Sequence, residues 1–196
     1  MGSLPALIAV LALVVTLVLV VAYTLATGVS PMPTGRAARA ALLGELPADP
    51  GGTVFELGAG WGGLAAALAR RYPTRPVVGY ELSPVPWLFA ALGRWCAGPA
   101  NLTLRRADFL RADLSPAGLI VCYLCPAGMA RLRPKLEAEL RPGSVVVSHF
   151  FALPGWRPEQ PVARAADAAC SPIYRYCFPR CLAPTVAPGG EPGRNP

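Results

Sequence analysis

Histidine is almost absent from this sequence, because His149 is its only imidazole. A zinc site built from cysteine and histidine needs four ligands at close spacing, and one histidine does not complete such an array. The spacing Cys122-x-x-Cys125 would also suit redox chemistry, but these two residues flank an apolar run that is typical of a strand. We therefore expect no metal site, and thiols that are buried in a reducing compartment. The six cysteines are Cys96, Cys122, Cys125, Cys170, Cys177 and Cys181.

Charged residues are also scarce, at 15% of the chain, and the net charge is +7. The arginines occur singly or in pairs, and no aromatic residues alternate with a basic run. A groove for single-stranded nucleic acid combines both features. We therefore expect no nucleic-acid partner, and we interpret the positive charge as ordinary surface with a mild preference for anionic lipid.

No charged residue precedes Arg36, and residues 4–27 form an apolar run that is long enough to span a bilayer. A cleaved signal peptide is the alternative, but the run lacks a basic flank before it and an A-x-A site after it. We expect an uncleaved transmembrane anchor. Because Arg36 and Arg39 follow the anchor, the positive-inside rule predicts a single-pass protein with its domain on the cytoplasmic side, at the inner membrane if the protein is bacterial.

Beyond the anchor, residues 28–52 form a linker in which 30–34 break the helix and 35–46 form a short amphipathic helix. One domain is expected over residues 53–180, and the Pro- and Gly-rich residues 183–196 are expected to be a disordered tail. No internal repeat is present. Expected strands are 53–57, 76–81, 102–106, 119–124 and 144–150, and expected helices are 63–71, 86–96 and 127–140.

Strands and helices thus alternate along the domain with short connections. This order predicts an α/β fold of the Rossmann-like, doubly wound type, with a mostly parallel sheet covered on both faces. Residues 160–167 and 173–178 are expected to add a closing antiparallel pair.

The segment "FELGAGWGG" begins at Phe55 and connects the first strand to the first helix of the domain. Gly58, Gly60 and Gly63 have the spacing G-x-G-x-x-G, which lets a ligand approach the main chain at a helix N-terminus. The pattern by itself is weak, because small residues also occupy such turns for packing alone.

Two carboxylates indicate which ligand this turn binds. Glu81 ends the second strand, where an acid accepts hydrogen bonds from ribose hydroxyls in sites for NAD and for S-adenosylmethionine alike. Glu56 lies two residues before Gly58, where it would repel the pyrophosphate of a dinucleotide but attract a sulfonium and an amino group. The sequence therefore predicts S-adenosylmethionine as the cofactor.

A third carboxylate, Asp108, follows the third strand. It is placed to accept a hydrogen bond from the adenine amino group while Phe109 packs on the adenine ring. Asp113 is an equally placed alternative.

Together these segments resemble a known family. In order along the chain, "PMPT", "FELGAGWGG", "VVGYELSPVPW", "RRADF", "PKLEAELRPG" and "FFALPGW" are similar to the membrane-anchored class I methyltransferases that methylate lysines of the ATP synthase c subunit and the adenine nucleotide translocase. The resemblance runs from about Pro31 to Phe178. It implies that Glu56, Gly58 and Gly60 hold the methionine moiety, that Glu81 holds the ribose, and that Asp108 holds the adenine.

One departure concerns the glycine turn itself. Mitochondrial members of this family look like G-x-G-D-G-R, whereas this chain has Trp61 and Gly63 in place of the Asp and the Arg. Trp61 could stack on the cofactor or the incoming cation, or only pack.

Residues for the methyl acceptor are less distinct. The loop after the fourth strand lacks the Asn/Asp-Pro-Pro-Tyr pattern of many amino-methylating enzymes, so backbone carbonyls or the Tyr123 hydroxyl would orient the nucleophile. His149 is a second candidate as a proton acceptor, although a structural role is typical of a single histidine at the end of a strand.

These observations predict a methyltransferase that acts near a membrane on a lysine amine of a protein. A membrane-tethered nucleotide-binding scaffold without turnover is the first alternative, and a nicotinamide-dependent oxidoreductase is the weaker second one.

Overall fold

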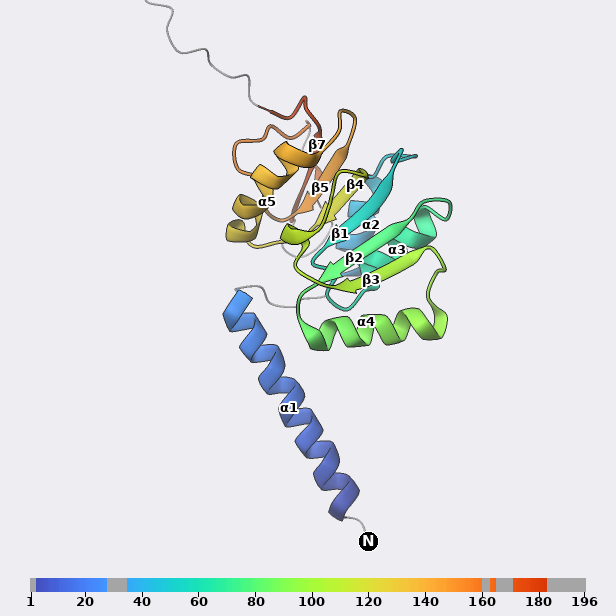
Figure 1. Cartoon of the computed structure of the whole chain (residues 1–196), viewed down its shortest axis with the longest axis vertical. Helices are drawn as coiled ribbons and strands as arrows, with labels where there is room; N and C mark the ends of the chain where they lie inside the picture. The colour runs from blue at the N-terminus through green and yellow to red at the C-terminus, as the bar shows by residue number, and fades with distance from the viewer. Residues whose placement is uncertain (1–2, 28–34, 160–162, 165–170, 183–196) are drawn as a thin grey trace, which may run out of the picture.

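The computed structural model describes residues 3–27, 35–159, 163–164 and 171–182. Helix α1 precedes an α/β domain in which strands and helices alternate (Figure 1). The helices are α1 (Ser3–Thr27), α2 (Arg36–Gly44), α3 (Gly63–Arg71), α4 (Pro84–Ala97), α5 (Pro126–Glu139) and the short 3-10 turn η1 (Phe109–Arg111). The strands are β1 (Thr53–Leu57), β2 (Val77–Glu81), β3 (Leu102–Arg106), β4 (Ala117–Cys122), β5 (Val145–His149), β6 (Ala163–Arg164) and β7 (Pro172–Cys177).

The seven strands form one sheet in the order β3-β2-β1-β4-β5-β7-β6. The five strands from β3 to β5 are parallel, β7 is added antiparallel to β5 at that edge, and β6 pairs antiparallel with β7. Parallel strands place all their carboxyl ends at one edge of the sheet, so the loops after β1, β2, β3, β4 and β5 lie together. The predicted doubly wound fold is confirmed.

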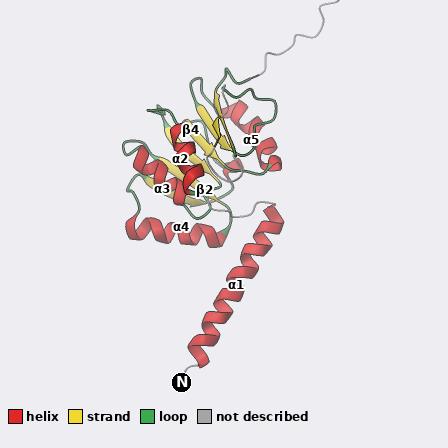
Figure 2. Ribbon diagram, turned by 180° about the vertical axis from the view of Figure 1, so that it is seen from behind, coloured by secondary structure: helices red, strands yellow, loops and turns green. Residues whose placement is uncertain are grey.

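The two faces of the sheet are covered differently (Figure 2). On one face, Leu42 of α2 and Leu68 of α3 pack with Val54, Val121 and other inward residues of the sheet. On the other face, Leu132 and Leu136 of α5 pack with Ile120 and Val146. The segment between β3 and β4 contains η1 and no longer helix, so this second face carries no helix over β1 and β2.

Several predicted boundaries need correction. Helix α4 begins at Pro84 rather than at 86, because proline suits the first helical position and Ser83 stands as the N-cap residue. Strand β4 ends at Cys122, so Tyr123 and Leu124 belong to the following loop. Only 163–164 of the first closing strand is described, and the expected tail at 183–196 lies outside the described residues.

The predicted membrane anchor at 4–27 falls on α1. Across the residues that the structure describes, no helix combines the length and the apolar character that crossing a membrane requires, so the anchor is not confirmed.

Candidate active site

The glycine-rich loop after β1 is held against the end of β2. The backbone N–H groups of Gly58 and Ala59 both donate to the carbonyl oxygen of Tyr80, at 2.9 and 2.8 Å. Gly58, Gly60 and Gly62 have left-handed φ angles of 85°, 52° and 78°. The sequence predicted Gly63 as the third glycine of the turn, but Gly62 closes the loop as the N-cap residue, and Gly63 is already the first helical residue of α3.

Space around these glycines differs from one to the next. A Cβ atom at Gly62 would lie 2.8 Å from the Cβ of Ala90, and one at Gly58 would lie 3.3 Å from Cδ2 of Leu124. A Cβ atom at Gly60 would meet no atom within 4 Å. Gly60 is therefore the point of the loop where a ligand can reach the main chain.

Glu81 connects this loop to the end of β2. Its Oε2 accepts a hydrogen bond from the Gly60 N–H at 2.7 Å, and its Oε1 accepts one from the Ser83 N–H at 2.7 Å. A carboxylate has about four lone-pair sites, so each oxygen retains capacity for one more donor. The backbone thus fixes the position of the Glu81 carboxylate, which is still able to accept hydrogen bonds from hydroxyl groups of a ligand.

Glu56 is a buried carboxylate beneath the loop, with 4% of its surface exposed. Among the described residues, its Oε2 has no hydrogen-bond partner. Burial, together with the nearby charge of Glu81, raises the pKa of Glu56 well above its usual range, while the Ala65 N–H and Arg39 oppose this rise in part. A cation bound at this oxygen would supply the missing partner and favour the ionised form.

The guanidinium of Arg39 lies next to Gly63, at the end of the glycine-rich loop. A Cβ atom at Gly63 would lie 3.3 Å from Nη2 of Arg39, which comes from α2. A guanidinium from α2 therefore lies beside the start of α3. Arg39 was not predicted as a residue of this site, because a contact between α2 and α3 leaves no trace in local sequence spacing.

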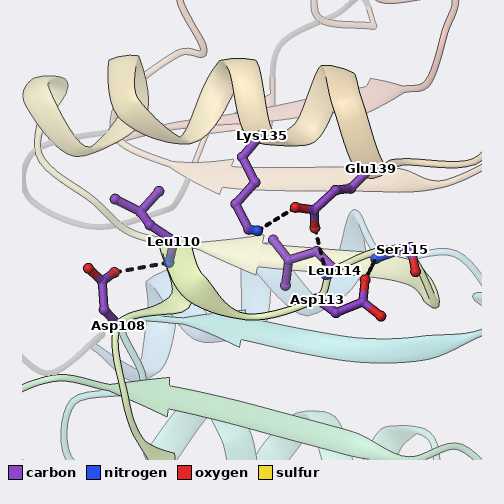
Figure 3. Close-up of polar contacts among 7 residues, drawn as sticks. All are labelled: Asp108, Leu110, Asp113, Leu114, Ser115, Lys135 and Glu139. Atoms are coloured by element: carbon purple, nitrogen blue, oxygen red, sulfur yellow. Dashed lines mark hydrogen bonds and ion pairs between the residues drawn. The ribbon is translucent and has the colours of Figure 1, made fainter.

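Asp108 follows β3 and caps η1, because its Oδ1 accepts a hydrogen bond from the Leu110 N–H at 2.9 Å (Figure 3). Asp113, the alternative, instead accepts from the Ser115 N–H at 2.9 Å, near the start of β4. Phe109 is half-buried and packs against the core. Geometry therefore favours Asp108, because it follows β3, the strand next to the one that Glu81 ends.

The face of β1 and β2 that no helix covers forms a groove of about 940 Å³. Its floor includes Phe55 and Tyr80, whose rings stack at a centroid distance of 6.1 Å. The groove reaches the carboxyl edge of the sheet at Leu82 and Asp108. An adenine ring near Asp108 would thus have an apolar surface beside it.

Trp61 lies in the loop with 39% of its surface exposed. Its ring packs against that of Phe89 in α4, with centroids 5.5 Å apart and planes tilted by 59°. The structure therefore gives Trp61 a packing partner within the chain and leaves part of the ring accessible.

Aromatic side chains gather where β4 and β5 end. Tyr123 lies 4.9 Å from His149 and 6.3 Å from Phe150 between ring centroids. His149 is buried, and its Nε2 is 2.8 Å from the hydroxyl oxygen of Ser171, which indicates a structural role. Phe150 has a left-handed φ of 73° and is 39% exposed, although it is not glycine. Such strain is often found at functional sites, and no sequence signal pointed to Phe150.

The described cysteines are all free thiols. Burial raises the pKa of Cys122 to about 12 and that of Cys181 to about 11. The expectation of buried thiols is confirmed for these two but is wrong for Cys96, which is exposed. Cys170 lies outside the described residues. Within the described part of the chain, no cluster of three or more His, Cys, Asp or Glu residues is arranged to hold a metal ion.

Comparison with known proteins places this site in a family. Residues 56–160 match the family described as "ANTKMT methyltransferase domain". A Mus musculus protein named adenine nucleotide translocase lysine N-methyltransferase is 37% identical over 144 residues, which cover 72% of this chain and 59% of that protein. A protein-lysine N-methyltransferase of Saccharolobus islandicus (strain REY15A) is 30% identical over 126 residues, covering 63% of this chain and 77% of that protein.

A solved structure supports the same fold. An RNA methyltransferase from Salinibacter ruber, crystallised with S-adenosyl-L-homocysteine, superposes with a TM-score of 0.65 and 29% identity. The match covers 78% of this chain and 97% of that one. The fold is therefore that of S-adenosylmethionine-dependent methyltransferases. The chain spans about six tenths of the length of the mouse relative.

Proposed function

Because the chain belongs to the ANTKMT methyltransferase domain family, we propose that it transfers a methyl group from S-adenosylmethionine to the amine of a protein lysine. The observation that carries this proposal is Glu56, a buried carboxylate with one unpartnered oxygen among the described residues, beneath a loop of left-handed glycines. Such an oxygen suits the positive charges of the methionine moiety. It does not suit the pyrophosphate of a nicotinamide cofactor, which it would repel.

In this proposal the ends of β1, β2 and β3 hold the cofactor. Glu56, Gly58 and Gly60 bind the methionine moiety, with Gly60 offering the open approach to the main chain. Glu81 accepts hydrogen bonds from the ribose hydroxyls with the lone pairs that Gly60 and Ser83 leave open. Asp108 accepts a hydrogen bond from the adenine amino group. Phe109 and Trp61 border the site as its aromatic residues.

When bound, the cofactor supplies a methyl carbon that is activated by a sulfonium, so the chain contributes mainly position and alignment. The lysine nitrogen must arrive neutral. It forms a bond to the methyl carbon as the carbon–sulfur bond breaks, and the extra proton of the nitrogen passes to water. We place the lysine between Tyr123 and Phe150, with the Tyr123 hydroxyl accepting a hydrogen bond from the amine.

The proposal is tested by incubating the full chain with radiolabelled methyl donor and with membrane, soluble-protein and RNA fractions of its own cells. Label should enter protein, and mass spectrometry should locate it on lysine. Tyr123→Phe should lower kcat with unchanged affinity for the cofactor. The RNA arm matters because the Salinibacter relative is named an RNA methyltransferase.

Three results would contradict this proposal. No label in any fraction, with the cofactor bound, would indicate the scaffold without turnover. Label in RNA alone would keep the methyl transfer and remove the lysine. Reduction or oxidation of a substrate with NADH, without methyl transfer, would favour the oxidoreductase.

We also propose that α1 attaches the chain to a membrane. Support comes from its side chains, because Leu4, Leu7 and Leu13 are 65–68% exposed and no charged residue occurs between residues 3 and 27. An exposed apolar surface of this size is typical of a site that contacts a membrane or another protein. The positive-inside rule then places the domain on the cytoplasmic side.

Membrane attachment is tested by fractionating cells that express the full chain. The chain should sediment with membranes and resist extraction at alkaline pH, which releases proteins bound only at the surface. Leu11→Arg, in the middle of the apolar run, should release it. Recovery of the unchanged chain in the soluble fraction would contradict the attachment and would leave the methyl transfer untouched.

A further inference from the structure

The outward face of α4 carries no polar side chain. Leu88, Phe89, Leu92 and Trp95 are 50%, 55%, 47% and 81% exposed. These four residues, which we call the α4 surface, are spaced along one side of the helix. The other exposed residues of α4 are Gly93, Cys96 and Ala97. A surface helix of a soluble domain usually has charged or polar residues on this side.

The charged residues on α4 and on the side of β3 that faces it are arginines. Arg94 is the only charged residue of α4, and its Nε donates to the carbonyl oxygen of Leu102 at 2.9 Å. No acidic residue occurs between 82 and 107, and Arg106 is exposed on the neighbouring strand β3. Arg105 lies on the other face of the sheet, where it lines the groove beside Tyr80. The region therefore combines apolar side chains with positive charge, and the carboxylate that precedes α4, Glu81, is bonded to the backbone of Gly60 and Ser83.

The position of α4 in the fold is also informative. Helix α1 leaves the domain on the side where α4 lies, and the two helices come close to each other (Figure 1). Both α1 and the α4 surface thus expose apolar side chains. A helix with an apolar side and basic neighbours is typical of one that lies in the interface of an anionic bilayer.

We infer that the α4 surface rests on a bilayer with anionic lipids, with Trp95 reaching into the interfacial layer. Tryptophan favours this layer because its ring is apolar and its N–H is polar. Arg106 lies on the same side of β3 as Leu104, which faces α4, and is then placed to attract lipid phosphates. A second copy of the chain is the competing occupant, and the test below separates the two.

This contact would fix the orientation of the candidate active site. Phe89 of the α4 surface packs on Trp61 of the glycine loop, with ring centroids 5.5 Å apart. The loop that we propose to hold the cofactor therefore lies beside the bilayer, and acceptors at the membrane surface have the shortest path to it. This consequence for the acceptor rests on the proposed function, whereas the lipid contact does not.

The test uses tryptophan fluorescence of the full chain in vesicles of phosphatidylcholine and phosphatidylglycerol. Lipids with bromine near the top of the acyl chains quench tryptophans that enter the interface. Trp95→Phe should remove most of this quenching, because Trp95 is the most exposed of the large apolar residues. Trp156→Phe is the matched control, since Trp156 is 5% exposed and should contribute none.

A second variant, Leu92→Ser with Trp95→Ser, should reduce the quenching of the remaining tryptophans, because the helix then no longer enters the lipid. Equal quenching in the unchanged chain and in Trp95→Phe would overturn the inference. Dimers on sedimentation that the double variant dissociates, together with unquenched Trp95, would also overturn it in favour of a second copy. Neither result depends on whether the chain transfers methyl groups.

Discussion

The Glu81 carboxylate at the end of β2 accepts a 2.7 Å hydrogen bond from the backbone N–H of Gly60, in the loop that follows β1. This bond joins two parts of the candidate site that are far apart in the chain. Glu81 therefore shapes the glycine loop and offers its remaining lone pairs to a ligand.

Replacement of Glu81 should weaken cofactor binding. Charge-assisted hydrogen bonds contribute about 1.5–3 kcal/mol each, so Glu81→Ala should lower the affinity for S-adenosylmethionine by at least about tenfold. Calorimetry with the full chain measures this change. Glu159→Gln is the control, because Glu159 is exposed in an ion pair with Arg175, and the affinity of this variant for the cofactor should not change. Unchanged affinity in a folded Glu81→Ala variant would refute the proposed ribose site.

Glu56 should make cofactor binding depend on pH. Burial raises the pKa of Glu56 in the folded protein. Without a ligand, its carboxyl therefore stays protonated at pH values above its ordinary pKa of 4.5. The stability that Glu56 contributes is therefore present below about pH 4.5 and is lost as the pH rises through the raised pKa. A cationic ligand favours the ionised form, so binding should release a proton and tighten as the pH rises over the same window.

The proton release is measured by calorimetry in buffers with different enthalpies of ionisation. Glu56→Gln should remove it and should weaken binding most at the upper end of the window. Glu159→Gln, on the surface in an ion pair with Arg175, is the control that should leave the release in place. Binding without proton release in the unchanged chain would contradict the cationic partner at Glu56.

Two glycine substitutions should separate binding from folding. Gly60→Ala adds a methyl group where no protein atom lies within 4 Å, so stability should fall only by the left-handed strain of about 1–2 kcal/mol. Gly62→Ala adds the same strain and a 2.8 Å contact with Ala90, so it should cost about 1–3 kcal/mol more. Cofactor affinity should nevertheless fall strongly in Gly60→Ala. Thermal unfolding and calorimetry of both variants decide this, and full affinity in Gly60→Ala would place the cofactor elsewhere.

The backbone strain at Phe150 should lower the stability of the fold, while its ring supports the proposed methyl transfer. Its left-handed backbone is closed by a hydrogen bond from the Phe151 N–H to the His149 carbonyl oxygen, which is a strained three-residue turn. Phe150→Gly and Phe150→Ala both lose the ring, but glycine also relieves the strain. The glycine variant should therefore be more stable than the alanine variant by about 1–2 kcal/mol in urea unfolding, while both methylate protein equally poorly. Equal stability would mean that the turn is not strained.

The core should be sensitive at Tyr176, whose hydroxyl oxygen accepts a hydrogen bond from the buried Leu153 N–H at 2.9 Å. Burial also raises the pKa of Tyr176 to about 12, so the hydroxyl stays protonated through neutral pH. Tyr176→Phe leaves the N–H without an acceptor and should cost about 1–3 kcal/mol of unfolding free energy. Urea unfolding with an unchanged m value measures this loss, and a neutral effect would indicate that the N–H finds another acceptor.

Local sequence determined much of this protein. The alternation of strand and helix patterns predicted the doubly wound sheet, because the two periods of apolar residues are set by the backbone of each element alone. The positions of Glu56 and Glu81 followed in the same way, since each stands at the end of a strand and so at the ligand edge of a parallel sheet. The glycine spacing located the loop but misassigned its last left-handed residue.

Only the tertiary structure decided the remaining features, because they depend on contacts between residues far apart in the chain. Gly62 rather than Gly63 takes the left-handed conformation where α4 leaves no room for a side chain. The guanidinium near Gly63 comes from Arg39 in α2, and Phe150 is strained by the meeting of β5 and β7. The exposed α4 surface arises likewise, because burial of one side of α4 against β2 and β3 leaves its other apolar side outward.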